Sequence, residues 1–330
     1  MSIPRTDHRE PPATGRFRVG IVGLGRIGHH HARSLDVGVL TAGLDYSAGA
    51  RSTFADRFAV PTYAPTDADA FFADVDAVII CVPNAFHEEY AVDALARGVH
   101  VLLEKPLAHT LASAERIADA ADRSDAVCTV GFNNRFATAV GHAKTAIDAG
   151  DVGRVTHIET NYMRSGGAPD GWFTDPDVAG GGAFLDLGVH ALDVALYLLG
   201  HPTVIDVTGV THPADADVED TAHAFVTTAD WRTIAVNASW DAPIDDYNIT
   251  IHGTDDRLTF DLLDDPTDTY VAEHRAFEAA IAAGDPGDVE TALAVQRVIS
   301  RVYARSDPAI DPVTEPGETI TIEVDTPEAP

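Results

Sequence analysis

Lys105 is one of only two lysines in a chain of 330 residues that carries 52 acidic residues. A lysine ammonium can lower its pKa and exchange a proton, whereas an arginine guanidinium cannot, so a retained lysine indicates a chemical role. The side chain follows Glu104 and the apolar run 101–103, and Pro106 ends regular structure directly afterwards. The pair is therefore expected at the carboxyl end of a buried strand, where open α/β sheets bind ligands. The alternative is a plain Glu-Lys pair on a loop.

A second group of candidate catalytic side chains lies in the apolar run 183–200. Asp186, His190 and Asp193 have the spacing i, i+4 and i+7, which places them on one face of a helix. Oxidation of a secondary alcohol needs a base at the hydroxyl and a cation beside the developing alkoxide, and His190 and Lys105 suit these roles. Asp186 suits holding a neighbouring hydroxyl or orienting the imidazole. The alternatives are a metal site, which Asp-x-x-x-His can form, and a helix with a satisfied buried histidine.

The sequence GLGRIG follows a β-branched apolar run at 17–22 and leads directly into a helical pattern. In that context the first glycine permits a tight turn, the second a close approach of a pyrophosphate, and the third helix-to-strand packing. The helix amino terminus then offers free N–H groups to the phosphates. The motif therefore predicts a dinucleotide site. The cofactor contacts predicted within it are Gly23, Gly25, Arg26, Ile27 and Gly28.

Asp45 ends the next predicted strand, 17 residues after the last glycine of the motif. A carboxylate at this place accepts hydrogen bonds from the adenosine ribose and repels a 2′-phosphate, which favours NAD as the cofactor. Arg51 is near enough in the sequence to leave NADP open. A nicotinamide already provides the electrophile for hydride transfer, so no metal is predicted.

Strand-like and helix-like patterns alternate from residue 17 to residue 132, which predicts an α/β fold with an N-terminal Rossmann domain, a doubly wound parallel sheet. Asn84 and Lys105 then fall at carboxyl ends of strands, on the edge that the glycine loop occupies. Further on, strands rich in Val, Thr and Ile with short turns predict a C-terminal α+β domain with an open, mostly antiparallel sheet. The predicted parts are a disordered tail (1–16), an NAD(P)-binding domain (17–132) and a substrate domain (133–330) that ends in a short strand (319–324).

The net charge of -30 argues against binding nucleic acid or an anionic membrane. Abundant aspartate and rare lysine on an ordinary core indicate a halophilic cytoplasm, because molar salt shortens the Debye length to about 3 Å and screens self-repulsion. The chain shows no signal-peptide pattern and no apolar run of about 18 residues, so a cytoplasmic protein without a membrane span is predicted. Cys81 and Cys128 lie in apolar runs without ligand spacing, which predicts reduced core residues.

Three motifs together closely resemble the Gfo/Idh/MocA oxidoreductases, the family of glucose-fructose oxidoreductase and inositol dehydrogenase. They are GLGRIG, Glu-Lys-Pro at 104–106, and GGG-x-x-x-D-x-x-x-H at 180–190. The likeness extends from about residue 17 to the carboxyl end. It implies an NAD(P)-dependent oxidoreductase that acts on a CH–OH group of a sugar, inositol or related polyol.

The resemblance also implies roles for individual residues. Its implied catalytic residues are Lys105, Asp186 and His190. Its implied further cofactor contacts are Pro83, Asn84, Glu104 and Lys105, with Glu104 beside the nicotinamide ribose. Family members are usually dimers or tetramers built on the open sheet of the second domain, so a homodimer or homotetramer is expected.

Substrate contacts are the least specific part of the resemblance. Many members carry an Arg-Arg or Arg-Phe pair after the last strand of the first domain, where this chain has Asn-Asn-Arg. A loop rich in Gly, Pro and Asp at 165–182 is of the kind that usually carries function. The predicted substrate contacts are Lys105, Asn134, Arg135, Arg164, Trp172, Asp186 and His190, and Asp170 is a further candidate by position.

Other functions within the family remain open. Some members retain a tightly bound cofactor and couple two substrates, some are NAD-dependent glycosidases, and some are non-catalytic nucleotide-sensing proteins. The sensing proteins should lack the catalytic lysine and histidine, and this chain has both.

Overall fold

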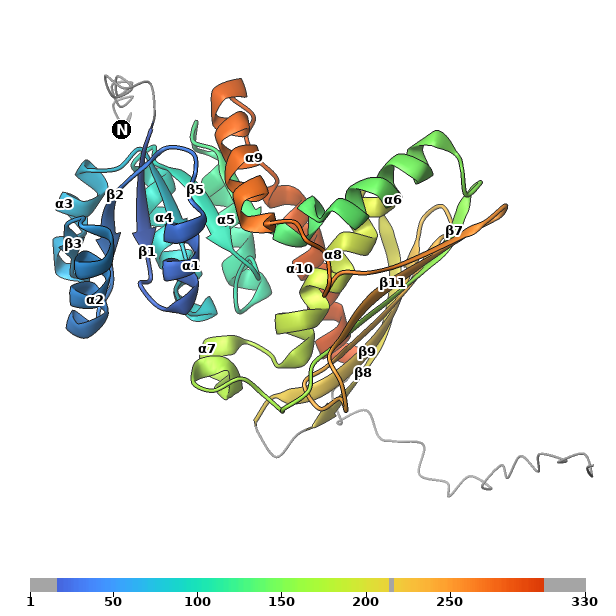
Figure 1. Ribbon diagram of the computed structural model, residues 1–330. Helices are drawn as coiled ribbons and strands as arrows, with labels where there is room; N and C mark the ends of the chain where they lie inside the picture. The colour runs from blue at the N-terminus through green and yellow to red at the C-terminus, as the bar shows by residue number, and fades with distance from the viewer. Residues whose placement is uncertain (1–16, 214–216, 306–330) are drawn as a thin grey trace, which may run out of the picture.

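The computed structural model describes residues 17–213 and 217–305. The predicted tail at 1–16 and the predicted strand at 319–324 lie outside these residues. Two six-stranded sheets form separate layers, with helices packed on them and between them (Figure 1).

The first sheet is parallel throughout and has the strand order β3-β2-β1-β4-β5-β6. Its short runs of Val, Ile and Leu are buried on both faces, as parallel strands covered by helices require. The chain runs outward from β1 to β3 and returns to β4 on the other side of β1, which opens a crevice at the carboxyl ends of β1 and β4. The predicted doubly wound sheet is confirmed. The elements are β1 Arg18–Val22, α1 Arg26–Ser34, β2 Val39–Leu44, α2 Ala48–Phe58, β3 Thr62–Tyr63, α3 Ala68–Ala73, β4 Ala77–Ile80, α4 His87–Ala96, β5 His100–Glu104, α5 Leu111–Asp122 and β6 Cys128–Gly131.

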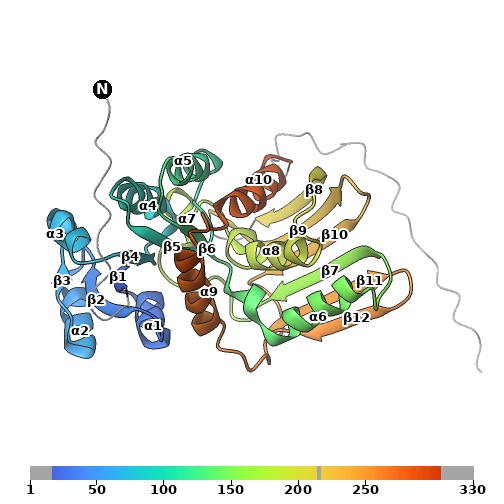
Figure 2. The same ribbon diagram turned by 90° about the horizontal axis from the view of Figure 1, so that it is seen from above.

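The second sheet has the order β12-β11-β7-β10-β9-β8, and all neighbouring pairs are antiparallel except β10 with β7. Helices α6, α8 and α10 cover one face, and no helix of the described residues covers the other (Figures 1 and 2). Ile158, Val236 and Ile249 point into the covered face and are fully buried, while their strand neighbours face outward. The predicted open, mostly antiparallel sheet is confirmed. The elements are α6 Thr138–Ala149, β7 Val155–Met163, α7 Pro176–Ala179, α8 Val189–Leu198, β8 Val204–Pro213, β9 Glu219–Thr228, β10 Thr233–Ser239, β11 Asp246–Gly253, β12 Arg257–Asp261 and α10 Val289–Arg305.

Helix α9, Thr269–Ala283, follows the second sheet in the sequence but packs on the first. Phe277 belongs to the same buried cluster as Val19 and Ile21 of β1. Residues 133–330 therefore do not all lie in the second layer. The start of α9 returns to the carboxyl edge of the first sheet, beside α1 (Figure 2).

The apolar segment that carries Asp186 and His190 is not one regular α-helix. Phe184–Gly188 form a π-helical turn, and α8 follows directly. A π-helical turn changes the angular spacing of side chains, so the predicted single face for Asp186, His190 and Asp193 is wrong. The segment Pro176–Leu198, which contains α7, the π-helical turn and α8, is the one stretch within the described ranges that is long and apolar enough to cross a bilayer, but 78% of its most apolar window is buried inside the protein.

Candidate active site

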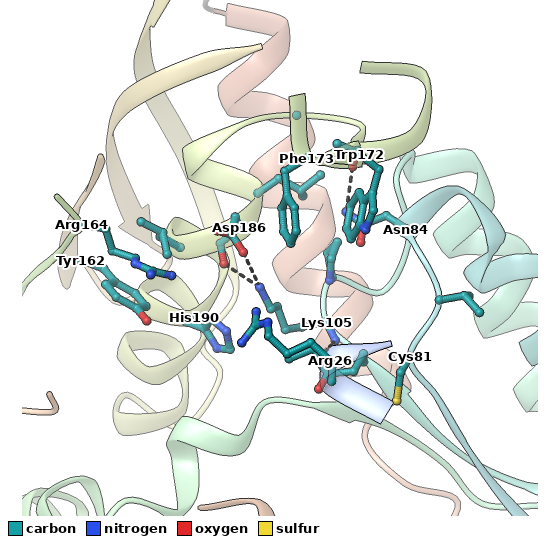
Figure 3. Close-up of a pocket in the computed structure, with 18 of the residues that line it drawn as sticks. Arg26, Cys81, Asn84, Lys105, Tyr162, Arg164, Trp172, Phe173, Asp186 and His190 are labelled. Atoms are coloured by element: carbon teal, nitrogen blue, oxygen red, sulfur yellow. Dashed lines mark hydrogen bonds and ion pairs between the residues drawn. The ribbon is translucent and has the colours of Figure 1, made fainter. Parts of the chain in front are cut away.

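Two adjoining cavities lie at the carboxyl edge of the first sheet. The catalytic pocket, about 260 Å³, is lined by Lys105 after β5 and by Asp186 and His190 from the π-helical turn and α8 (Figure 3). The cofactor cavity, about 840 Å³, lies along the glycine loop and the end of β2. Trp172 and Phe173 line both, so ligands in the two cavities would lie side by side.

Lys105 and Asp186 form an ion pair in the catalytic pocket. Lys105 Nζ donates to Asp186 Oδ1 at 2.8 Å and to its carbonyl oxygen at 2.9 Å, and Trp240 Nε1 donates to Oδ2 at 3.1 Å. Burial would lower the pKa of Lys105, but Asp186 outweighs burial and raises that pKa. Burial would raise the pKa of Asp186, but Lys105 outweighs burial and lowers that pKa. Lys105 is thus held as a cation.

His190 is a neutral imidazole in this pocket. Burial, and then the Lys105 ammonium, lower its pKa to about 3. Its Nδ1 is buried without a hydrogen-bond partner among the residues described, which leaves Nε2 as the nitrogen available to a ligand. The ring lies beside Lys105 in Figure 3. A neutral ring nitrogen next to a fixed ammonium is able to accept a proton while the ammonium stabilises negative charge.

Glu104 is held by a chain of two buried histidines. Its Oε1 lies 2.9 Å from Nε2 of His31, Nδ1 of His31 lies 2.8 Å from Nε2 of His274, and Nδ1 of His274 lies 3.3 Å from the Ser34 carbonyl oxygen. A carbonyl only accepts, so His274 donates to it and accepts from His31. Burial alone would raise the pKa of Glu104, but the hydrogen bond from His31 together with the nearby Lys105 ammonium lowers that pKa. His31 therefore orients the Glu104 carboxylate beside Lys105.

The glycine loop has the shape that a dinucleotide requires. An added Cβ at Gly23, whose φ is +92°, would lie 2.6 Å from the Cys81 carbonyl oxygen. An added Cβ at Gly28 would lie 2.0 Å from the Gly23 carbonyl oxygen, whereas one at Gly25 would meet nothing within 4 Å. Gly25 therefore leaves open space at the amino terminus of α1, where backbone N–H groups can bind a pyrophosphate.

Asp45 lines the cofactor cavity and not the catalytic pocket. Its Oδ2 accepts from the Leu24 N–H at 2.8 Å and its Oδ1 accepts from the Ser47 N–H at 2.7 Å, which fixes the carboxylate. Arg51 donates to the carbonyl oxygens of Asp45 and Tyr46 and does not line the cavity. The fixed carboxylate suits ribose hydroxyls and disfavours a 2′-phosphate.

Most of the predicted cofactor residues line one of the two cavities. Those along the cofactor cavity are Gly23, Gly25, Arg26, Ile27, Asp45 and Pro83, and those along the catalytic pocket are Arg26, Ile27, Asn84, Glu104 and Lys105. Arg164 and Trp172, predicted as substrate contacts, also line the catalytic pocket. Asp170 is exposed and lines neither cavity.

Asn134 and Arg135, which the sequence predicted as substrate contacts, do not line the catalytic pocket. Arg135 is bound by Asp193 at 2.5 and 2.8 Å and by Asp288 at 2.5 Å. Asn134 Nδ2 donates to the Tyr247 hydroxyl at 3.3 Å. A buried guanidinium needs carboxylate partners, and Arg135 has two here. Because Asp193 is one of them, it is not a third ligand for the metal site that the helix spacing left open.

Several residues of the site were not predicted. Tyr162 lines the pocket and stacks on Tyr247 with ring centroids 4.0 Å apart. It precedes Arg164 by two residues, so the period of a strand would have placed both on the same side. Trp240 and His31 hold Asp186 and Glu104 from distant parts of the chain, and no local pattern marks either contact.

Comparison with known proteins assigns the chain to a family. Residues 17–132 match an oxidoreductase family with an NAD-binding Rossmann fold, and residues 140–259 match the GFO/IDH/MocA C-terminal domain. The chain belongs to the GFO/IDH/MocA oxidoreductase family. The GFO/IDH/MocA matches cover both sheets, and the resemblance drawn from the three motifs is confirmed.

Individual relatives and structures agree with this assignment. The chain is 34% identical over 252 residues to a protein of Amycolatopsis mediterranei assigned to UDP-kanosamine synthase as its oxidoreductase subunit, covering 68% of each chain. It is 31% identical to scyllo-inositol 2-dehydrogenase (NAD(+)) of Bacillus subtilis, over 56% of this chain and about half, 54%, of that protein. The crystal structure of GenD2 from gentamicin A biosynthesis in complex with NAD superposes with a TM-score of 0.82 at 27% identity, covering 94% of this chain and 98% of that one.

Proposed function

We propose that this family member uses NAD to oxidise a CH–OH group of a sugar, inositol or related polyol. The proposal rests on the meeting of Lys105, Asp186 and His190 in a pocket that adjoins the cofactor cavity. A nicotinamide bound at this junction would take up the hydride from the substrate carbon. NAD is favoured over NADP by the fixed Asp45 carboxylate.

The three catalytic residues divide the work. His190 Nε2 accepts the hydroxyl proton, because burial keeps this ring neutral. Lys105 stabilises the alkoxide that develops as the proton leaves. Both carboxylate oxygens of Asp186 already accept hydrogen bonds, from Lys105 and Trp240, so Asp186 positions the ammonium and keeps it charged.

The test is nicotinamide absorbance with a panel of aldoses, inositols, sugar acids and sugar phosphates, with NAD and NADP separately, in molar potassium chloride. Reduction of NAD with one polyol class is the expected result. Binding of NADH without turnover on any member would contradict the proposal and favour a nucleotide-sensing protein or a retained cofactor.

We also propose a homo-oligomer, in a halophilic cytoplasm, that associates through the open face of the second sheet. This face exposes Phe225, and Asn161, Asn237 and Asn248 form a hydrogen-bonded row across it. Phe225 and the asparagine row carry no charge, which suits contact between copies of a chain whose net charge is -30. Light scattering in molar salt should give twice or four times the 35.0 kDa chain mass, and Phe225→Asp should lower it.

A further inference from the structure

Two arginines line the catalytic pocket without a carboxylate partner. The lysine and both carboxylates of this pocket are already paired. Arg26 and Arg164 remain, and neither side chain forms an ion pair or hydrogen bond within residues 17–213 and 217–305. In a protein with a net charge of -30, two unpaired guanidinium groups in one pocket indicate an anionic ligand.

The two arginines serve different parts of the site. Arg26 is the first residue of α1 and lines both cavities, so it lies where a pyrophosphate would bind. Arg164 lines only the catalytic pocket. In Figure 3, Arg164 and Tyr162 lie on one side of the pocket, and Cys81 and Asn84 lie on the other. The charge of Arg164 is therefore left for the substrate.

The backbone of Arg164 is fixed where β7 ends. Its N–H donates to the Ser239 carbonyl oxygen at 2.8 Å, and its carbonyl oxygen accepts from the Ala242 N–H at 3.1 Å. Asp245 attracts the Arg164 guanidinium electrostatically but forms no hydrogen bond or ion pair with it. Its Oδ1 instead accepts hydrogen bonds from Ser165 N and Oγ at 2.7 and 2.8 Å. The planar guanidinium keeps its paired N–H donors free, a geometry that matches carboxylate or phosphate oxygens.

We propose that the substrate is a sugar or polyol of monosaccharide size that carries a carboxylate or phosphate, which Arg164 binds while the reacting hydroxyl faces His190. This inference rests on the proposed function and specifies the substrate class. Pockets for small molecules usually have volumes of about 300–1,000 Å³. The catalytic pocket, at about 260 Å³, lies near the lower end of this range and suits a single monosaccharide. The overall negative charge repels anions, and Arg164 supplies the local positive charge that such a substrate needs.

The test compares substrates that differ only in the anionic group: glucose, glucuronate and glucose 6-phosphate, and galactose with galacturonate. The wild-type enzyme should have a higher kcat/KM for one anionic class than for the matched neutral sugar. Arg164→Gln should lower this ratio by about 10- to 100-fold, mainly through KM, because a hydrogen bond to a charged group is lost. Arg164→Lys should recover part of the ratio. Arg123→Gln, which removes an exposed arginine far from the pocket, should keep it.

The possible results separate the inference from the proposed function. Preference for uronates identifies a carboxylate, and preference for the phosphate ester identifies a phosphoryl group. Equal or better turnover of the neutral sugars, or an unchanged ratio in Arg164→Gln, overturns the anionic substrate and leaves the polyol dehydrogenase standing. Absence of turnover with every sugar, neutral or anionic, overturns both.

Discussion

Two ion pairs hold the apolar segment 184–198 to the loops that follow β5 and β6. In the pocket pair, Lys105 binds Asp186, and 17% and 15% of these side chains are exposed. In the core pair, Arg135 binds Asp193, and the exposed fractions are 11% and 1%. Each cation meets an aspartate on the same helical segment, but Lys105 lines the catalytic pocket together with His190, whereas Arg135 lines a separate cavity of about 220 Å³ beside α9.

The choice of cation fits each place. Arg135 spans two carboxylates, Asp193 and Asp288, with a planar group that has several fixed donors. Lys105 concentrates its charge on one atom, which binds Asp186 from one side and leaves the other side toward the pocket. Both pairs join a cation to an aspartate. The core pair stabilises the protein interior, whereas the pocket pair positions a positive charge for catalysis.

Breaking the core pair should have the largest effect. Arg135→Met leaves the buried Asp193 and the partly exposed Asp288 without their cation, so the free energy of unfolding should fall by about 3–5 kcal/mol. Urea denaturation at a fixed molar potassium chloride concentration measures this loss. Arg123→Met, at an exposed position, is the control and should change the unfolding free energy by less than about 0.5 kcal/mol. A loss no larger than in the control would contradict the structural role of Arg135.

Breaking the pocket pair should act on catalysis instead. Lys105→Met removes the cation at the developing alkoxide, so kcat/KM should fall by about 100- to 1000-fold. The only other lysine provides the matched control: Lys144 is partly exposed to solvent and pairs with Asp148 one helical turn away. Lys144→Met should keep the wild-type rate. Steady-state kinetics of both variants decide the point, and wild-type turnover in Lys105→Met would make the catalytic assignment wrong.

The sequence assigned Lys105 and Asp186 to one site, although not their ion pair, and it did not indicate the core pair, for a physical reason. Lys105 and Asp186 lie in motifs whose strand, loop and helix contexts can be recognised locally, and both sheets follow from strand patterns in the same way. Arg135 was assigned to the substrate because its partners are 58 and 153 residues away, beyond the reach of any local pattern. Asp193 was placed on the catalytic face because the π-helical turn at 184–188 is not visible in a 3.6-residue period.

Exchanging the two cations should sharpen the comparison. Arg135→Lys keeps the charge but cannot bridge Asp193 and Asp288 as the guanidinium does, so stability should fall by about 1.5–3 kcal/mol. Lys105→Arg keeps the charge but displaces its centre, so kcat/KM should fall by up to about 100-fold. The measurements are urea denaturation for the first variant and steady-state kinetics for the second. If both variants behaved as the wild type does, a positive charge alone would be sufficient at positions 105 and 135, and the shape of the cationic group would not matter.

A smaller effect should appear in the pH dependence of stability. It comes from His190, which lies in the catalytic pocket beside Lys105. The folded pKa of about 3 lies below the ordinary value of 6.5, owing to burial and then to Lys105. Between these values the unfolded chain binds a proton that the folded protein does not. The stability associated with His190 is therefore fully present above pH 6.5 and is lost as pH falls toward 3, with a slope of at most about 1.4 kcal/mol per pH unit.

Replacing His190 by a residue that does not titrate should remove this contribution. In His190→Gln, the decline in unfolding free energy between pH 6.5 and pH 4 should become shallower, as measured by denaturation at a series of pH values. His142→Gln, at an exposed histidine of α6, should leave the decline unchanged. The kcat/KM of the wild-type enzyme should likewise show no fall centred near pH 6.5, because His190 is already neutral there. An unaltered slope in His190→Gln would mean that the ring titrates normally, and then Lys105 and burial would not keep it neutral for proton transfer.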